Sequence, residues 1–136
     1  MRSTEELEHE IRESDSPEGL SSPDFEAPEV TGYLNTLLEA RGLTAGEAVR
    51  RCNLDRGYGY QMLNGTRRPT REFLILLSLA LELGEAEAQR LLKLAGRPPL
   101  YARNRRDAAV LYGLSHGLGL EAADELLGEL GEERLL

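Results

Sequence analysis

Two short helices separated by a tight turn are predicted by the stretch LTAGEAVRRCNLDRGYGYQMLNG near the middle of the chain. Thr44 and Glu47, three residues apart, form a capping box, which predicts a helix start. Asn53 tolerates the left-handed backbone conformation that a sharp turn requires, so the first helix should end there. Asp55 can cap a second helix, and the pair Asn64-Gly65 should end it. The stretch therefore predicts a helix-turn-helix, around which the rest of the chain is organised.

The segment from about Tyr33 to Leu83 resembles the Xre or phage-repressor class of helix-turn-helix domains. In that family the second helix of the motif enters the major groove of DNA. The residues that carry the resemblance are Leu37, Arg41-Gly42-Leu43-Thr44, Glu47, Val49, Asn53-Leu54, Tyr58, Gln61-Met62-Leu63-Asn64-Gly65, Arg68-Pro69 and residues 76–83.

The resemblance implies a sequence-specific DNA-binding regulator of transcription that inserts residues 55–63 into the major groove of double-stranded DNA. Arg would favour the O6 and N7 atoms of guanine, and Gln the N6 and N7 atoms of adenine. Proteins of this class usually bind DNA as dimers, so a homodimer is one expected partner arrangement. Carried over by position, the base-facing residues would be Asp55, Arg56, Gly57 and Gln61, and the phosphate contacts would come from Thr44, Thr66, Arg67, Arg68 and Arg71.

Two glycines depart from the family pattern. Gly59 occupies a position where a bulky aliphatic side chain is usual, and Gly57 one where a polar reader is common. Each glycine inside a helix costs about 0.5–1 kcal/mol relative to alanine. The pattern predicts a reading helix that is soft or that is completed only on binding, and it keeps a second function open. This alternative is a protein-binding adaptor that uses a degenerate helix-turn-helix fold and engages its partner through the acidic tail or the C-terminal hairpin.

The net charge of −8 is concentrated at the N-terminus. Residues 1–30 contain ten acidic residues and two arginines, whereas residues 31–136 contain fourteen acidic and fourteen basic residues. Residues 1–28 are also rich in Ser and Pro, so they are expected to form an acidic, largely disordered tail. The tail has three candidate roles: a solvated segment, an arm that competes with DNA for the arginines, or a docking or phosphorylation segment.

The domain at residues 29–96 should hold four further helix boundaries. Thr31 is expected to cap its first helix and Gly42 to end it. Thr70 should cap a helix that is apolar on nearly every side and therefore central to the core. Gly84 should separate that helix from a final one over residues 85–95.

The C-terminal third repeats the middle of the chain. Moving residues 71–96 forward by 35 positions places them on residues 106–131, with five leucines on leucines and two glycines on glycines, among them Leu79 on Leu114 and Gly96 on Gly131. Two-helix units with such a period stack on one another. Residues 97–136 should therefore form a helical hairpin that packs on the preceding copy, with a dimer surface as the alternative. Together the elements predict an all-α fold: a repressor-like helix-turn-helix domain, a C-terminal hairpin and a flexible acidic N-terminal tail.

Several other functions find no support in the sequence. His9 and His116 are far apart and there is one cysteine, Cys52, so neither a metal site nor a disulfide is expected, and a reducing cytoplasm fits. No apolar run reaches the roughly 18 residues that span a membrane. Asp124 and Glu125 look like surface acids of a helix and have no catalytic partner. We therefore expect no cofactor and no enzymatic activity.

Overall fold

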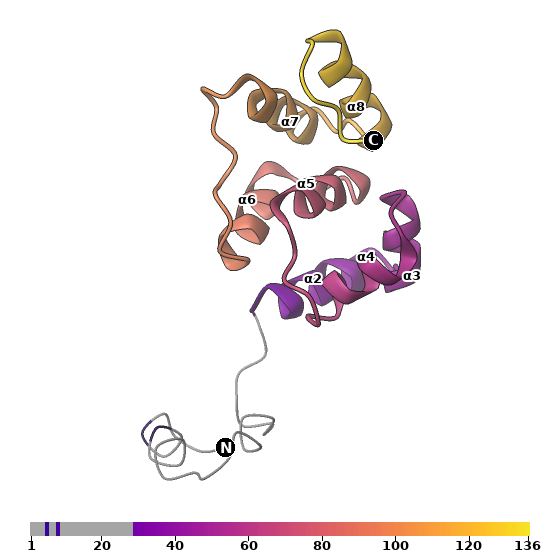
Figure 1. The fold of residues 1–136 in the computed structure, drawn as a ribbon, viewed down its shortest axis with the longest axis vertical. Coiled ribbons are helices and arrows are strands. Elements are labelled where there is room, and N and C mark those ends of the chain that lie inside the picture. Colours follow the sequence, from indigo (N-terminus) through magenta and orange to yellow (C-terminus); the bar gives the residue numbers. More distant parts are fainter. Residues whose placement is uncertain (1–4, 6–7, 9–28) are drawn as a thin grey trace.

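The computed structural model describes Glu5, Glu8 and residues 29–136, and the expectations for the rest of the acidic tail lie outside these residues. The described part of the chain contains helices and no strand, which confirms the all-α class. The helices are α2 (Glu29–Ala40), α3 (Ala45–Arg51), α4 (Arg56–Leu63), α5 (Arg71–Ala80), α6 (Glu85–Leu94), α7 (Arg105–Ser115) and α8 (Leu120–Glu129) (Figure 1).

The boundaries of α3 and α4 follow the capping pattern of the sequence. Thr44 caps α3, and the side chain of Glu47 completes the capping box. Asn53, with φ +54°, turns the chain between the two helices. The Oδ1 atom of Asp55 accepts the backbone N–H of Tyr58 at 3.0 Å and caps α4. Gly65, with φ +84°, follows the last turn, so each local signal lies where the sequence predicted it.

The start of α2 differs from the prediction. The helix already includes Glu29 and Val30, so Thr31 lies inside its first turn and cannot act as the N-cap. The physical reason is burial, because a helical Val30 places its side chain in the core beside Leu34. The Oγ1 atom of Thr31 is buried, and among the residues that the structure describes it has no hydrogen-bond partner.

The core is built around α5. Its side chains are buried on nearly every face, from Phe73 to Leu79, as the continuous apolar pattern predicted. Thr70 caps it by accepting the backbone N–H of Phe73 at 3.1 Å. In Figure 1 this helix runs between the α2–α4 part of the molecule and the hairpin α7–α8. It packs against α3, α6, α7 and α8, so it joins the two halves of the fold.

The sequence repeat is also a structural repeat. The helix α6 begins at Glu85 and α8 begins 35 positions later, at Leu120. Backbone conformations with positive φ recur at the same interval, at Glu82 and Gly117 and again at Gly96 and Gly131. Both copies therefore turn the chain at equivalent places, even though the first turn uses Glu82 where the second uses a glycine.

The hairpin α7–α8 packs on α5 and α6 of the same chain, as the duplication favoured. Two ion pairs join the first turns of α5 and α7 reciprocally. Arg71 of α5 donates to Asp107 of α7 at 2.8 Å, and Arg106 of α7 donates to Glu72 of α5 at 3.0 Å. The two helix starts are therefore held together by charge-assisted hydrogen bonds in addition to apolar packing.

Candidate nucleic-acid interface

The helix α4 presents one polar face to solvent. Met62 and Leu63 are buried on its inner side, whereas Arg56, Gly57 and Gln61 are exposed on the outer side. This separation follows from the helical spacing of the apolar residues. The structure therefore brings the expected base-facing residues together on one surface. Asp55 is exposed at the start of the same helix, and its carboxylate serves as the N-cap.

Two tyrosines of α4 support arginines on or beside that face. The guanidinium carbon of Arg56 lies 5.9 Å from the ring centroid of Tyr60, and that of Arg67 lies 5.0 Å from the ring centroid of Tyr58. Such distances allow cation–π attraction, and the ring limits where the guanidinium can point. Sequence reasoning missed this role of the two tyrosines. The spacing of Arg56 and Tyr60, four residues apart on one helix, was the signal that could have revealed the first pair.

Close packing of α3 on α4 explains Gly59. A Cβ atom at this position would lie 2.8 Å from Cγ1 and 2.9 Å from Cγ2 of Val49 in α3. Both distances are well below ordinary carbon contacts, so only glycine lets the two helices approach this closely. Gly59 is thus a packing residue.

Thr44 lies at the start of α3, and its hydroxyl is already engaged. Its Oγ1 accepts the backbone N–H of Glu47 at 3.2 Å and donates to the Glu47 carboxylate at 3.0 Å. Thr66 is exposed after α4, where its backbone N–H donates to the side chain of Asn64 at 2.9 Å. Of these two candidate phosphate contacts, Thr44 is committed to capping in this conformation.

The arginines that follow α4 divide into two groups. Arg67 is exposed beside Gln61, and its Nε donates to Gln61 Oε1 at 3.2 Å. Arg68 instead donates through Nε and Nη2 to the carbonyl of Ala95, at 3.2 and 3.0 Å, at the end of α6. Such a contact satisfies a carbonyl that the helix itself leaves unpaired.

Arg71 lies deeper between the two repeats. It donates to the carbonyls of Pro98 and Pro99, each at 3.0 Å, as well as to the buried carboxylate of Asp107. Arg68 and Arg71 therefore hold the segment between α6 and α7, a role that sequence reasoning missed. Their acceptors lie 27 or more residues away in the chain, so no local pattern could have revealed it.

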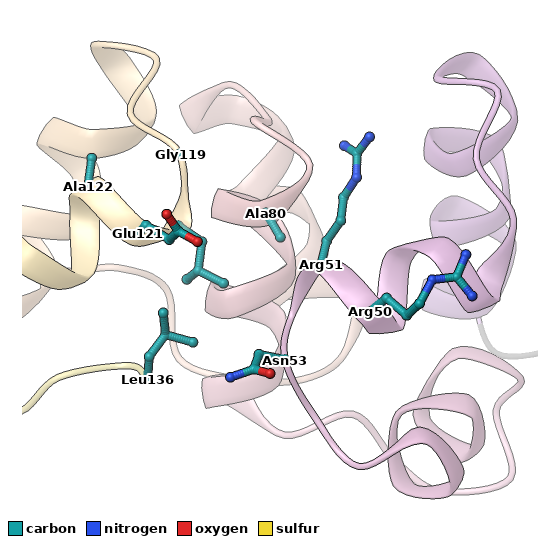
Figure 2. A pocket seen from close by; sticks show the side chains of 9 residues that line it. Arg50, Arg51, Asn53, Ala80, Gly119, Glu121, Ala122 and Leu136 are labelled. Carbon is teal, nitrogen blue, oxygen red and sulfur yellow. The ribbon is translucent and has the colours of Figure 1, made fainter.

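A cavity of about 790 Å³ separates the end of α3 from the start of α8. Arg50 and Arg51 line it from α3, and Glu121 lines it from α8, so charges of both signs meet there. Figure 2 shows the Arg50 side chain extending away from the side chains of α8. The cavity lies at the opposite end of α3 from Thr44, and the expected base-facing residues of α4 do not line it.

Cys52 and Asp124 are two ionisable residues that lie in the core. Cys52 is buried, and burial raises the pKa of its thiol to about 12, which suits an inert apolar residue rather than a redox sensor. Asp124 is 2% exposed, so the expectation of a surface acid was wrong. It accepts from Arg134 Nε at 2.9 Å and from the backbone N–H of Leu135 at 2.8 Å. These hydrogen bonds hold the pKa of its carboxyl below the ordinary range.

The part of the chain that the structure describes offers no group of three or more metal-ligating side chains. Within the same residues, every helix is too short or too polar to cross a bilayer. The sequence was also compared with models of known protein families, with curated proteins and with solved structures, and none of them matches. The functional interpretation therefore depends on the geometry of the α3–α4 pair.

Proposed function

We propose that this chain is a sequence-specific DNA-binding regulator, in which α2–α6 form a repressor-like helix-turn-helix domain and α4 enters the major groove. The observation that carries the proposal is the outer face of α4. It carries Arg56 and Gln61, with Arg67 of the following loop beside Gln61, and the opposite side of the helix is buried against α3 and the core. A rigidly backed helix with exposed hydrogen-bonding side chains suits readout of base edges.

In this mechanism Arg56 and Gln61 contact base edges. Arg56 lies at the first position of α4, the end that approaches the groove floor in helix-turn-helix proteins. The Tyr60 ring restrains its guanidinium before binding, so less side-chain entropy is lost on contact. Gly57 leaves open space beside these two side chains, which allows a base pair to approach the helix backbone.

The first test is retention of DNA by the full chain. We expect it to shift random duplex at low salt in an electrophoretic assay, and to enrich a particular sequence from a random pool. Gln61→Ala should cost about 1–3 kcal/mol on the enriched duplex and leave random duplex nearly unaffected. Arg103→Ala, at an exposed position in the link between the repeats, is the control for a surface substitution away from α4. Equal losses in the Gln61 and Arg103 variants would argue against base reading by Gln61.

A protein-binding adaptor is the second candidate, and one observation favours it. Tyr101 and Tyr112, in and after the link between the repeats, are 60% and 51% exposed. Exposed tyrosines are enriched at protein interfaces because they combine an apolar ring with a polar tip. This function would be supported if the chain binds no duplex, Tyr112→Ala no longer binds a protein partner, and variants of α4 still bind that partner.

A further inference from the structure

Arg67 is held in place by two contacts with α4. Its Nε donates to Gln61 Oε1 at 3.2 Å, and its guanidinium lies over the ring of Tyr58 at 5.0 Å. Its backbone N–H also donates to the carbonyl of Gln61 at 3.0 Å, which fixes the chain direction after the helix. The side chain is therefore folded back against the last turn of α4. It does not extend freely toward a phosphate backbone.

These contacts also orient the Gln61 amide. The amide oxygen accepts from Arg67, so the Nε2 group, with its two N–H donors, faces away from that contact. Among the residues that the structure describes, Arg67 makes no other side-chain hydrogen bond, so the N–H groups of Nη1 and Nη2 remain available. The pair thus presents several donors side by side. Arg68 differs, because Ala95 and Gly96 accept from its Nη2.

We propose that Arg67 and Gln61 act as one specificity-determining unit that recognises an acceptor-rich base edge, as guanine presents at O6 and N7. This inference rests on the proposed DNA-binding function and assigns Arg67 a role that differs from the phosphate contact implied by resemblance. Guanine offers two acceptors in the major groove, whereas adenine offers one acceptor and one donor. The donors of the pair match guanine, because Gln61 Oε1 already accepts from Arg67 and only one of its two lone pairs is left for the amino group of adenine.

The experiment uses the duplex that the full chain enriches from a random pool, with a scrambled duplex of the same length as reference. Dissociation constants are measured at several salt concentrations for Arg67→Ala, Arg67→Lys, Gln61→Ala and the double variant Arg67→Ala/Gln61→Ala. Lysine keeps the charge of arginine but lacks the planar guanidinium that contacts Gln61 and Tyr58 together. It therefore separates charge from geometry.

We expect Arg67→Ala to weaken binding to the enriched duplex about tenfold or more and to change binding to the scrambled duplex little. Arg67→Lys should fail to restore the loss. The double variant should lose no more than the worse single variant, because the two residues act together. When the random pool is selected again with Arg67→Ala, the preference of the protein for guanine at that position of the site should also be lost.

Two other results would overturn the inference. In the first, the wild-type chain enriches a duplex, but Arg67→Ala weakens binding to the enriched and the scrambled duplex equally. The salt slope also becomes shallower by about 0.9, and Arg67→Lys restores binding. Arg67 would then be a phosphate contact. This outcome leaves the proposed function intact. If the wild-type chain retains no duplex at low salt, the proposed function fails and the inference fails with it. The side-chain amide signals of Gln61 in an NMR spectrum without DNA test the contact itself, and they should shift in Arg67→Lys.

Discussion

The two glycines of α4 allow a matched test of how closely α3 and α4 pack. A Cβ atom at Gly59 would lie 2.8 Å from Cγ1 of Val49, whose side chain is itself buried. A Cβ atom at Gly57 would meet only Asp55 Oδ1, at 3.5 Å, which is an ordinary contact. Gly57→Ala and Gly59→Ala therefore make the same chemical change in one short helix. They differ in whether the added methyl group meets a side chain of α3.

The expected magnitudes follow from two opposing terms. Replacing glycine by alanine inside a helix gains about 0.5–1 kcal/mol, and Gly57, in the first turn, should lie at the low end. Overpacking a filled core typically costs about 1–3 kcal/mol, and only Gly59→Ala incurs this cost. Gly57→Ala should therefore be neutral or slightly stabilising. Gly59→Ala should be destabilising by up to about 2 kcal/mol, and the difference between the variants reports the clash with Val49.

The assay is urea and thermal unfolding of the full chain, followed by far-ultraviolet circular dichroism. For a chain of this size 1 kcal/mol shifts Tm by roughly 3–5 °C, so the two variants should be clearly resolved. Adding Val49→Ala to Gly59→Ala should relieve the clash. The loss in free energy of unfolding of the double variant should therefore be smaller than the sum of the two single losses by at least about 0.5 kcal/mol. Equal stabilisation by both glycine substitutions would refute the close packing of the helices.

Three further predictions address the buried acid, the arginines and the tail. The hydrogen bond from Arg134 lowers the pKa of Asp124 below its ordinary 3.8. The ionised carboxylate therefore stabilises the fold above that pH. This contribution to stability is lost as the pH falls through the lowered pKa. Asp124→Asn should cost about 1–2 kcal/mol at pH 7 in urea unfolding and flatten the loss of stability below pH ~4; an unchanged acid profile would contradict this. Arg68→Ala should destabilise by about 0.5–1.5 kcal/mol, because it frees the carbonyls at the end of α6, whereas Arg67→Ala should leave Tm nearly unchanged; the reverse order in thermal unfolding would exchange their roles. Deleting residues 1–28 should tighten DNA binding most at low salt, where screening is weakest. Equal affinities of the full-length and the truncated chain in a salt titration would show that the acidic tail does not compete with DNA.

The local features of the fold were predictable from the sequence because their partners lie within a few residues. The cap at Thr44 and its capping partner Glu47 are three residues apart, and so are Asp55 and the N–H that it accepts. The duplication was equally readable, since it repeats the same leucines and glycines at a fixed interval. These signals were sufficient to predict an all-helical chain with a hairpin packed on its first copy.

The errors arose where a distant partner determined the role of a residue. Thr31 has the chemistry of a cap, but burial of Val30 extends α2 past it. Asp124 has the chemistry of a surface acid, but Arg134 and two backbone N–H groups, ten or more residues away, surround it. At Gly59 the residue that leaves no room for a side chain is Val49 of another helix, which could not be placed against it from the sequence. In each case tertiary packing overrode the local preference.

The division of the arginines also bears on how the chain would hold DNA. Arg68 and Arg71 donate to carbonyls and to Asp107, so in this conformation they contribute little to neutralising phosphates. Each phosphate contact adds about 0.9 to the slope of log affinity against log salt, so losing two such contacts would lower that slope by about 1.8. One copy would therefore bind duplex weakly and depend mainly on base contacts. Two copies on adjacent half-sites would double both the phosphate contacts and the base contacts. If the proposed function holds, we therefore expect a homodimer on a two-fold symmetric site.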